Sequence, residues 1–416
     1  MRGTVQPLRC DGGGGDGEGD FEAEDFFWWR SLPEFDGTGV GTTKAGKVKA
    51  ATARKRVVRE MERLAAAAAE SLDEVRHRLL TYRPGDLWVP AGGLAKQDTD
   101  IPRVITLLLL GFTGVGKSSL VNLMYSVLGR SCFVPFAQSS SQADKDGHAL
   151  CLEEHNVLRS MKNGFCVFDS PGLDYDRISD GLDEVSEWME QGVRHRQPCR
   201  GYSSSSSPST SYSTAPASAT ANCFMHRRVN CAIVVAGLSE LHKSLISGHL
   251  QPLDATRQLF HHPSIRETCS ESLSRISSNS LMAKSSSSSS STDDGPILVL
   301  THGDELTAEE RIKTRVTVCE YLGLPETAGV YDVPTVNEFS GWYANEFDPV
   351  TGYAVAEMIY RALVVADRSH PPKSGMKECL LAVISWVMCT LAAFFAFLSC
   401  CCSKLAKMNR DHQKTR

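Results

Sequence analysis

Apolar runs alternate with amphipathic stretches through the middle of the chain, from Val104 to His370. The apolar runs read VITLLLLG, FCVFDS, CAIVVAG and ILVLTHG. Such near-continuous runs are typical of strands that are buried on both faces of a parallel sheet. Residues 305–323 and 350–366 are amphipathic at helical spacing instead. The alternation predicts an α/β domain with helices on both faces of a mostly parallel sheet.

A second pattern, with an apolar position every three or four residues, predicts a helix over about residues 47–82. Its apolar stripe consists of Val57, Met61, Leu64, Ala68, Leu72, Val75 and Leu79. Pro84 and Gly85 follow and end the helix, and the first half of the helix is basic. The pattern favours packing of the stripe on the α/β domain with the charges in solvent. A coiled-coil partner site and contact with anionic lipid are the alternatives.

A third pattern lies near the C-terminus, where Leu380 to Ser399 contain no charged residue. A helix of about 20 residues spans about 30 Å, the thickness of bilayer hydrocarbon. We therefore expect a transmembrane anchor over 379–402; a buried core helix is the alternative. The N-terminus has no apolar signal segment, so the bulk of the chain is expected in the cytosol. The short basic tail favours a plastid or mitochondrial outer membrane as the intracellular membrane.

These patterns predict one globular domain with several appendages. The expected parts are a disordered acidic Gly-rich tail (1–45), the basic helix (46–82), a linker (83–102), the α/β domain (103–372), the membrane anchor (379–402) and a basic tail (403–416). Within the domain, the Ser-rich segments 198–222 and 270–294 read as disordered loops. The aromatic patch Phe26–Trp29 either docks a partner or folds back on the domain.

Composition narrows the class of protein. Of 416 residues, 42% are hydrophobic and 22% charged, which excludes wholesale disorder, collagen and a multi-span membrane protein. The net charge of -5 argues against a nucleic-acid binder, because such proteins are basic. The 14 cysteines form no CxxC pair and no Cys/His cluster with zinc spacing, so most of them are interpreted as reduced cytosolic thiols. Cys400 to Cys402, beside the expected anchor, are either palmitoylation sites or the end of the span.

The first chemical motif follows the run VITLLLL and precedes a helical stretch. Gly111 to Ser118 match GxxxxGK[ST], the phosphate-binding loop. Its glycines let backbone N–H groups turn toward phosphates, and Lys117 would reach the β- and γ-phosphates. The Ser118 hydroxyl would bind Mg²⁺. The candidate nucleotide-binding residues here are Gly111, Thr113, Gly114, Val115, Gly116, Lys117, Ser118 and Ser119.

The second motif, DxxG, comprises Asp169 to Gly172 at the end of the run FCVF. A carboxylate at this strand end suits Mg²⁺ held through water, and the Gly172 N–H could approach a γ-phosphate. Asn163-Gly164 is a hairpin-turn signal. It predicts a strand within about 150–161 that pairs antiparallel with the strand ending at Asp169.

The third motif comprises Thr301 to Asp304, THGD, after the run ILVL. A carboxylate at Asp304 can accept hydrogen bonds from the N1–H and N2–H₂ groups of guanine, which adenine does not offer. The alternative is a helix cap, because a helical stretch follows directly.

In this order the three motifs resemble those of the translation-factor class of P-loop GTPases, over about residues 104–370. The TxxD form and the expected anchor are most similar to the septin-related group of immunity-associated GTPases and chloroplast Toc receptors. The resemblance implies a P-loop NTPase (G domain) fold, GTP as ligand and substrate, Mg²⁺, and dimerisation across the nucleotide face. It implies that Asp304 reads guanine and that His302 stacks on the base. Asn337-Glu338 is the candidate for a further base contact.

Two departures bear on hydrolysis. Between Arg130 and Asp169 there is no threonine to contact Mg²⁺ and the γ-phosphate, which leaves Ser139, Ser140 or Ser141, or a mobile polar loop. Leu173 stands where many GTPases place a water-orienting glutamine. We therefore name no catalytic residue and expect slow or partner-dependent hydrolysis.

The sequence leaves three functions open. The first is a tail-anchored GTP-binding switch with slow GTPase activity. The second is a nucleotide-binding membrane scaffold without significant hydrolysis, with partners recruited through the basic helix. The third is an ATPase or P-loop kinase.

Overall fold

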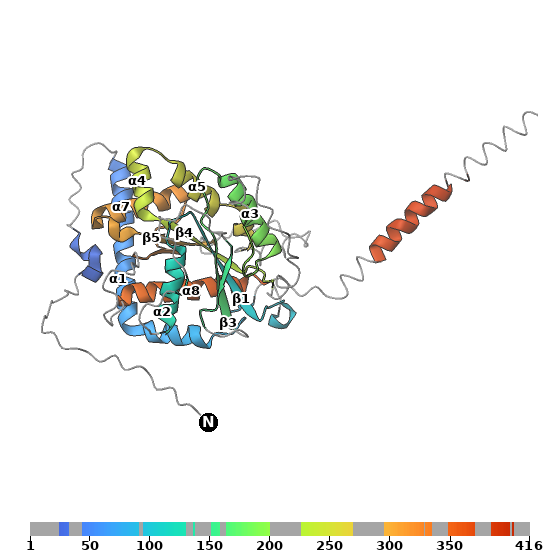
Figure 1. Cartoon of the computed structure of the whole chain (residues 1–416), viewed down its shortest axis with the longest axis horizontal. Helices are drawn as coiled ribbons and strands as arrows, with labels where there is room; N and C mark the ends of the chain where they lie inside the picture. The colour runs from blue at the N-terminus through green and yellow to red at the C-terminus, as the bar shows by residue number, and fades with distance from the viewer. Residues whose placement is uncertain are drawn as a thin grey trace, which may run out of the picture.

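The computed structural model of the chain contains an α/β domain and a separate C-terminal helix (Figure 1). The residues it describes are 25–32, 44–90, 95–129, 136–137, 151–158, 164–199, 226–268, 295–327, 329–334, 348–370, 384–399 and 402. Several expected features lie outside them: Ser139–Ser141, Asn163, Asn337, Glu338, nearly all of segment 198–222 and all of segment 270–294.

A sheet of six strands forms the centre of the domain, in the order β2-β3-β1-β4-β5-β6. The strands are β1 (Val104–Gly111), β2 (Glu153–His155), β3 (Gly164–Asp169), β4 (Cys231–Gly237), β5 (Ile297–Thr301) and β6 (Val330–Asp332). Neighbouring strands are parallel except for β2, which pairs antiparallel with β3 and places Glu153 opposite Asp169. Both the mostly parallel sheet and the antiparallel β2–β3 pair are confirmed.

Helices cover both faces of this sheet (Figure 1). The α-helices are α1 (Lys44–Thr81), α2 (Lys117–Gly129), α3 (Ile178–Gln191), α4 (Leu238–Ser247), α5 (Gln251–Phe260), α7 (Ala308–Leu322) and α8 (Pro349–Arg368). Helices α2 and α8 contact each other and β1, whereas α4 and α5 contact each other and β4. Every residue of β1 is buried, as expected for a strand with neighbours on both sides and helices above and below.

Helix α1 packs along α8 and against α7. The stripe residues Val57, Met61 and Leu64 are buried in the core, each of which stabilises the fold by about 1.5–3 kcal/mol. On the basic face, Arg54 pairs with Glu309 and Arg56 with Glu326, at 2.8 and 2.7 Å. Packing on the domain is therefore confirmed for this helix.

The aromatic patch folds back on the domain through the short helix η1 (Asp25–Ser31). Trp29 is only 2% exposed and donates its indole N–H to Glu62 of α1 at 2.8 Å. Arg30 binds the same carboxylate with a guanidinium fork. Of the two alternatives that the sequence left open, folding back is the one observed.

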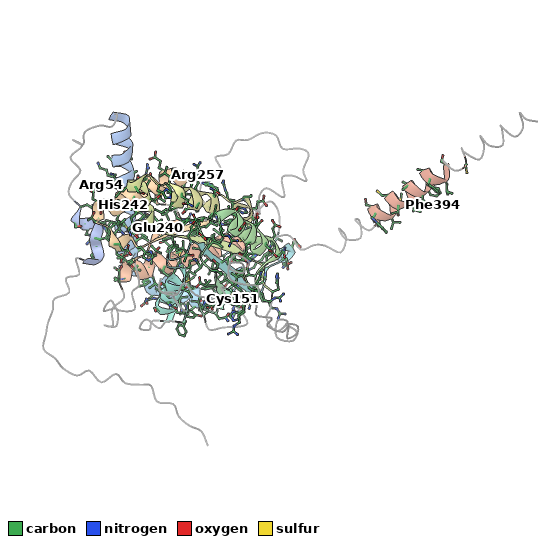
Figure 2. All side chains as sticks on the ribbon, turned by 45° about the horizontal axis from the view of Figure 1, so that its top comes forward. Arg54, Cys151, Glu240, His242, Arg257 and Phe394 are labelled. Atoms are coloured by element: carbon green, nitrogen blue, oxygen red, sulfur yellow. The ribbon has the colours of Figure 1, made fainter. Side chains whose placement is uncertain are left out.

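The prediction of a C-terminal transmembrane helix is wrong. Among the residues that the structure describes, no helix has the length and apolar character needed to cross a membrane. The described part of this segment, residues 384–399, is helical. It stands apart from the α/β domain, with Phe394 exposed on it (Figure 2).

Candidate nucleotide-binding site

The phosphate-loop motif links the end of β1 to the start of α2. Gly114 and Gly116 have φ angles of 82° and 80°, which residues with a Cβ atom rarely adopt. The neighbours of β1 in the sheet are β3 on one side and β4 on the other. The chain thus changes direction across the sheet at β1, and open α/β sheets bind ligands at such a point, beyond the carboxyl ends of the strands.

Lys117 is the first residue of α2, and it is only 6% exposed. Its ammonium donates to the carbonyl oxygens of Gly111 and Phe112 at 3.0 and 2.9 Å. Burial lowers the pKa of Lys117 to about 8, and the nearby Asp169 opposes this shift. A bound anion would likewise favour the charged form, so the loop presents a desolvated cation suited to phosphate.

Beside Lys117, Ser118 and Asp169 form a second polar centre. The Ser118 hydroxyl donates to Oδ2 of Asp169 at 2.5 Å, while the buried Oδ1 has no hydrogen-bond partner. Burial raises the pKa of Asp169, and Lys117 and Ser118 counter this effect. An unpartnered buried carboxylate oxygen next to a hydroxyl fits Mg²⁺, which takes few protein ligands and completes its shell with water and phosphate.

The DxxG segment lies directly against the phosphate loop. Leu173 N donates to Gly111 O, and Thr113 N donates to Leu173 O, both at 3.0 Å. A Cβ on Gly172 would lie 2.4 Å from the Thr113 Cα, so only glycine fits. Both donors of Thr113 are used here, because its hydroxyl also bonds Leu173 O at 3.2 Å.

Leu173 itself is directed into the core rather than toward the loop. It is 6% exposed and packs near Gly181 of α3. The following Tyr175 stacks on Phe112 with ring centroids 4.0 Å apart, and its hydroxyl donates to Glu240 of α4 at 2.8 Å. Figure 2 marks Glu240 on α4. Sequence reasoning missed the Tyr175 contacts, because its partners come from distant elements.

The third motif, THGD, contacts the phosphate loop at Val115. The Thr301 hydroxyl donates to the Val115 carbonyl at 2.8 Å. His302 adopts a left-handed φ of 57°, and its ring lies next to Gly116. A pocket opens between these two motifs. It is lined by Gly116, Ser119, Leu120, Leu123, Thr301, His302, Val333 and Pro334.

Asp304 is exposed within the short helix η5 (Gly303–Glu305), two residues after His302 of the pocket lining. Thr307, not Asp304, caps the helix α7 that follows, through a capping box with Glu310. The structure therefore does not use Asp304 as the N-cap. Asn337 and Glu338 lie outside the described residues, but Val333 and Pro334, just before them, line the pocket.

No protein-family model matches this chain, and no curated protein does either. The geometry of the cleft is therefore what bears on its chemistry. A buried ammonium and an unpartnered carboxylate oxygen lie at one end. The His302 ring lies at the other end, two residues before the exposed Asp304. The two ends suit a ligand with an anionic tail and a polar, planar head.

Sequence reasoning also missed Asn122, which is fully buried within α2. Its amide oxygen accepts from the backbone N–H groups of Phe136 and Ala137, at 2.9 and 2.7 Å. Residues 136–137 are the described part of the segment that leads to Ser139. Asn122 thus holds residues 136–137 against α2; a lone asparagine in the apolar stretch SLVNLMYSVL was the available signal.

Proposed function

We propose that this chain binds GTP with Mg²⁺ in the cleft and acts as a slow GTPase switch. The observation that carries the proposal is the bond from Thr301 to Val115, because it joins the base motif to the phosphate loop around one pocket. A nucleotide can bind only where the residues that hold its phosphates and the residues that hold its base lie within the length of one molecule.

At the phosphate end, Lys117 would bind the β- and γ-phosphates. Its ammonium is already held at the loop by two carbonyl oxygens, so little side-chain freedom is lost on binding. The N-terminus of α2 adds positive potential at the same place.

Ser118 and Asp169 would hold Mg²⁺, the latter through water. Within the described residues no group of three or more His, Cys, Asp or Glu side chains could cage a metal. Phosphate oxygens and water would complete the shell of the ion. When bound, Mg²⁺ neutralises charge on the phosphates.

At the base end, the His302 ring and the apolar side chains of Leu120 and Leu123 would contact the faces of the base. The Asp304 carboxylate would accept the N1–H and N2–H₂ bonds of guanine. Adenine would leave that carboxylate without donors, which favours GTP over ATP.

A second candidate is a nucleotide-binding scaffold with no significant hydrolysis. The burial of Leu173 against α3 favours this scaffold, because a buried leucine cannot orient a water molecule for attack on the phosphate. Single-turnover hydrolysis at high protein concentration separates the two. That assay also tests dimerisation across the nucleotide face, which stays a prediction.

Titration of the full chain with fluorescent GTP and Mg²⁺, followed by competition with unlabelled GTP or ATP, tests the proposal. We expect micromolar or tighter binding and displacement by GTP at much lower concentration than by ATP. Equal displacement would favour an ATPase or kinase. Absence of binding to either nucleotide would overturn the proposal.

A further inference from the structure

Arg311 of α7 lies at the junction of three segments around the base end of the cleft. Its guanidinium binds Asp332, the last residue of β6, through Nε and Nη2 at 2.9 and 2.7 Å. Both side chains are almost wholly buried. A buried, bidentate pair of this kind holds its geometry rigidly, because separating the charges leaves each of them desolvated.

The THGD loop rests on this pair. A Cβ on Gly303 would lie 2.6 Å from Nε of Arg311 and 2.9 Å from Oδ1 of Asp332. The backbone of Gly303 therefore fits against the Arg311–Asp332 pair with no space for a side chain. Asp304, which follows, takes its position from this support.

The same pair fixes the other wall of the pocket. Asp332 precedes Val333 and Pro334, which line the pocket. The Val333 N–H donates to Leu300 O at 2.8 Å, so the chain leaves β6 in register with β5. Burial raises the pKa of Asp348, the N-cap of α8, and Arg311 is the least of the groups that oppose this shift.

The N-terminal aromatic segment covers the guanidinium from outside. Arg311 Cζ lies 4.0 Å from the centroid of the Trp28 ring. The adjacent Trp29 and Arg30 bind Glu62 of α1, which secures the segment in place. Trp28 thus shields the Arg311–Asp332 pair from water and adds a cation–π contact.

We propose that Arg311 is a positioning residue for the base pocket, and that Trp28 makes base affinity depend on docking of residues Asp25–Ser31. This rests on the proposed nucleotide function. The supports of the phosphate loop are different ones, namely Lys117 and the DxxG segment. Undocking the aromatic segment should therefore weaken recognition of the base and leave phosphate binding unchanged.

The test compares two ligands on the full-length chain: GTP and inorganic tripolyphosphate, each with Mg²⁺. The W28A variant should bind GTP about three- to tenfold more weakly. Its affinity for tripolyphosphate, which has no base, should equal that of the wild type. The W28F variant keeps a ring over the guanidinium and should recover most of the GTP affinity.

A matched control is R54A, which breaks the Arg54–Glu309 pair between α1 and α7 without touching Trp28 or Arg311 (Figure 2 marks Arg54). It should bind both ligands as the wild type does. The R311K variant keeps the charge but loses the fork, and should lose GTP affinity at least as strongly as W28A. If W28A does not fold, the R311K variant by itself tests the inference.

Equal weakening of both ligands in W28A and R311K would overturn the inference, because it would indicate general loss of structure. Unchanged GTP affinity in both variants would overturn it as well. A wild-type chain that binds tripolyphosphate and shows no preference for GTP would instead overturn the proposed function. The two failures are therefore distinguishable.

Discussion

The two ends of the cleft are built in different ways. The end proposed for phosphate comes from one short stretch, Gly111 to Ser118, supported by the DxxG segment beside it. The end proposed for the base is assembled from the THGD loop, the exit of β6, Arg311 of α7 and Trp28. Anion binding needs mainly backbone N–H groups and one cation, which a local motif can supply. Reading a planar base needs side chains held from several directions.

This difference explains why a mutation at one end should leave the other intact. The bond from Thr301 to Val115 joins the two ends, but it involves a backbone carbonyl of the loop. The loop keeps its shape through β1 and the DxxG contacts. The predictions below separate the two ends by using GTP and tripolyphosphate as paired ligands.

The largest effect is expected for K117A. Loss of the buried ammonium removes the charge-assisted bonds to phosphate, so the affinities for GTP and tripolyphosphate should both fall about 100-fold. Isothermal titration of both ligands measures the loss. K117R, which keeps a cation, should bind better than K117A. If K117A weakened GTP binding alone, the assignment of this end to phosphate would be wrong.

A smaller and more selective effect is expected for D304N. The amide presents a donor where guanine also presents donors, so GTP affinity should fall about 20-fold while XTP binding improves. Competition between GTP and XTP measures this exchange. E305Q alters the neighbouring carboxylate on the same turn and should change neither ligand. A D304N variant that still prefers GTP would refute base reading by this residue.

The smallest effect is expected for G303A, compared with G172A. The new Cβ of G303A presses on the Arg311–Asp332 pair, so GTP affinity should fall about fivefold with tripolyphosphate unchanged. In G172A the Cβ meets the Thr113 backbone instead, so both ligands should weaken. Identical profiles for the two variants would contradict the separation of the two ends.

Much of the fold followed from pattern alone. The long apolar runs around Leu107 and Ile233 are buried strands, and the stripe through Val57 and Leu64 is the buried face of α1. These predictions succeed because an apolar run and a helical spacing are both properties of residues that are close together in the chain. The prediction that the apolar run from Leu380 spans a membrane is wrong, because no helix among the described residues is long and apolar enough to do so.

The chain's own sequence determined the order of the motifs, the strand–loop–helix setting of Lys117 and the antiparallel pairing before Asp169. Each depends on residues within one or two elements. Tertiary structure alone decided that Leu173 turns into the core, that Gly303 rests on the Arg311–Asp332 pair and that Trp28 covers it. Those contacts join residues far apart in the chain, and their partners are chosen by packing, which no local pattern encodes.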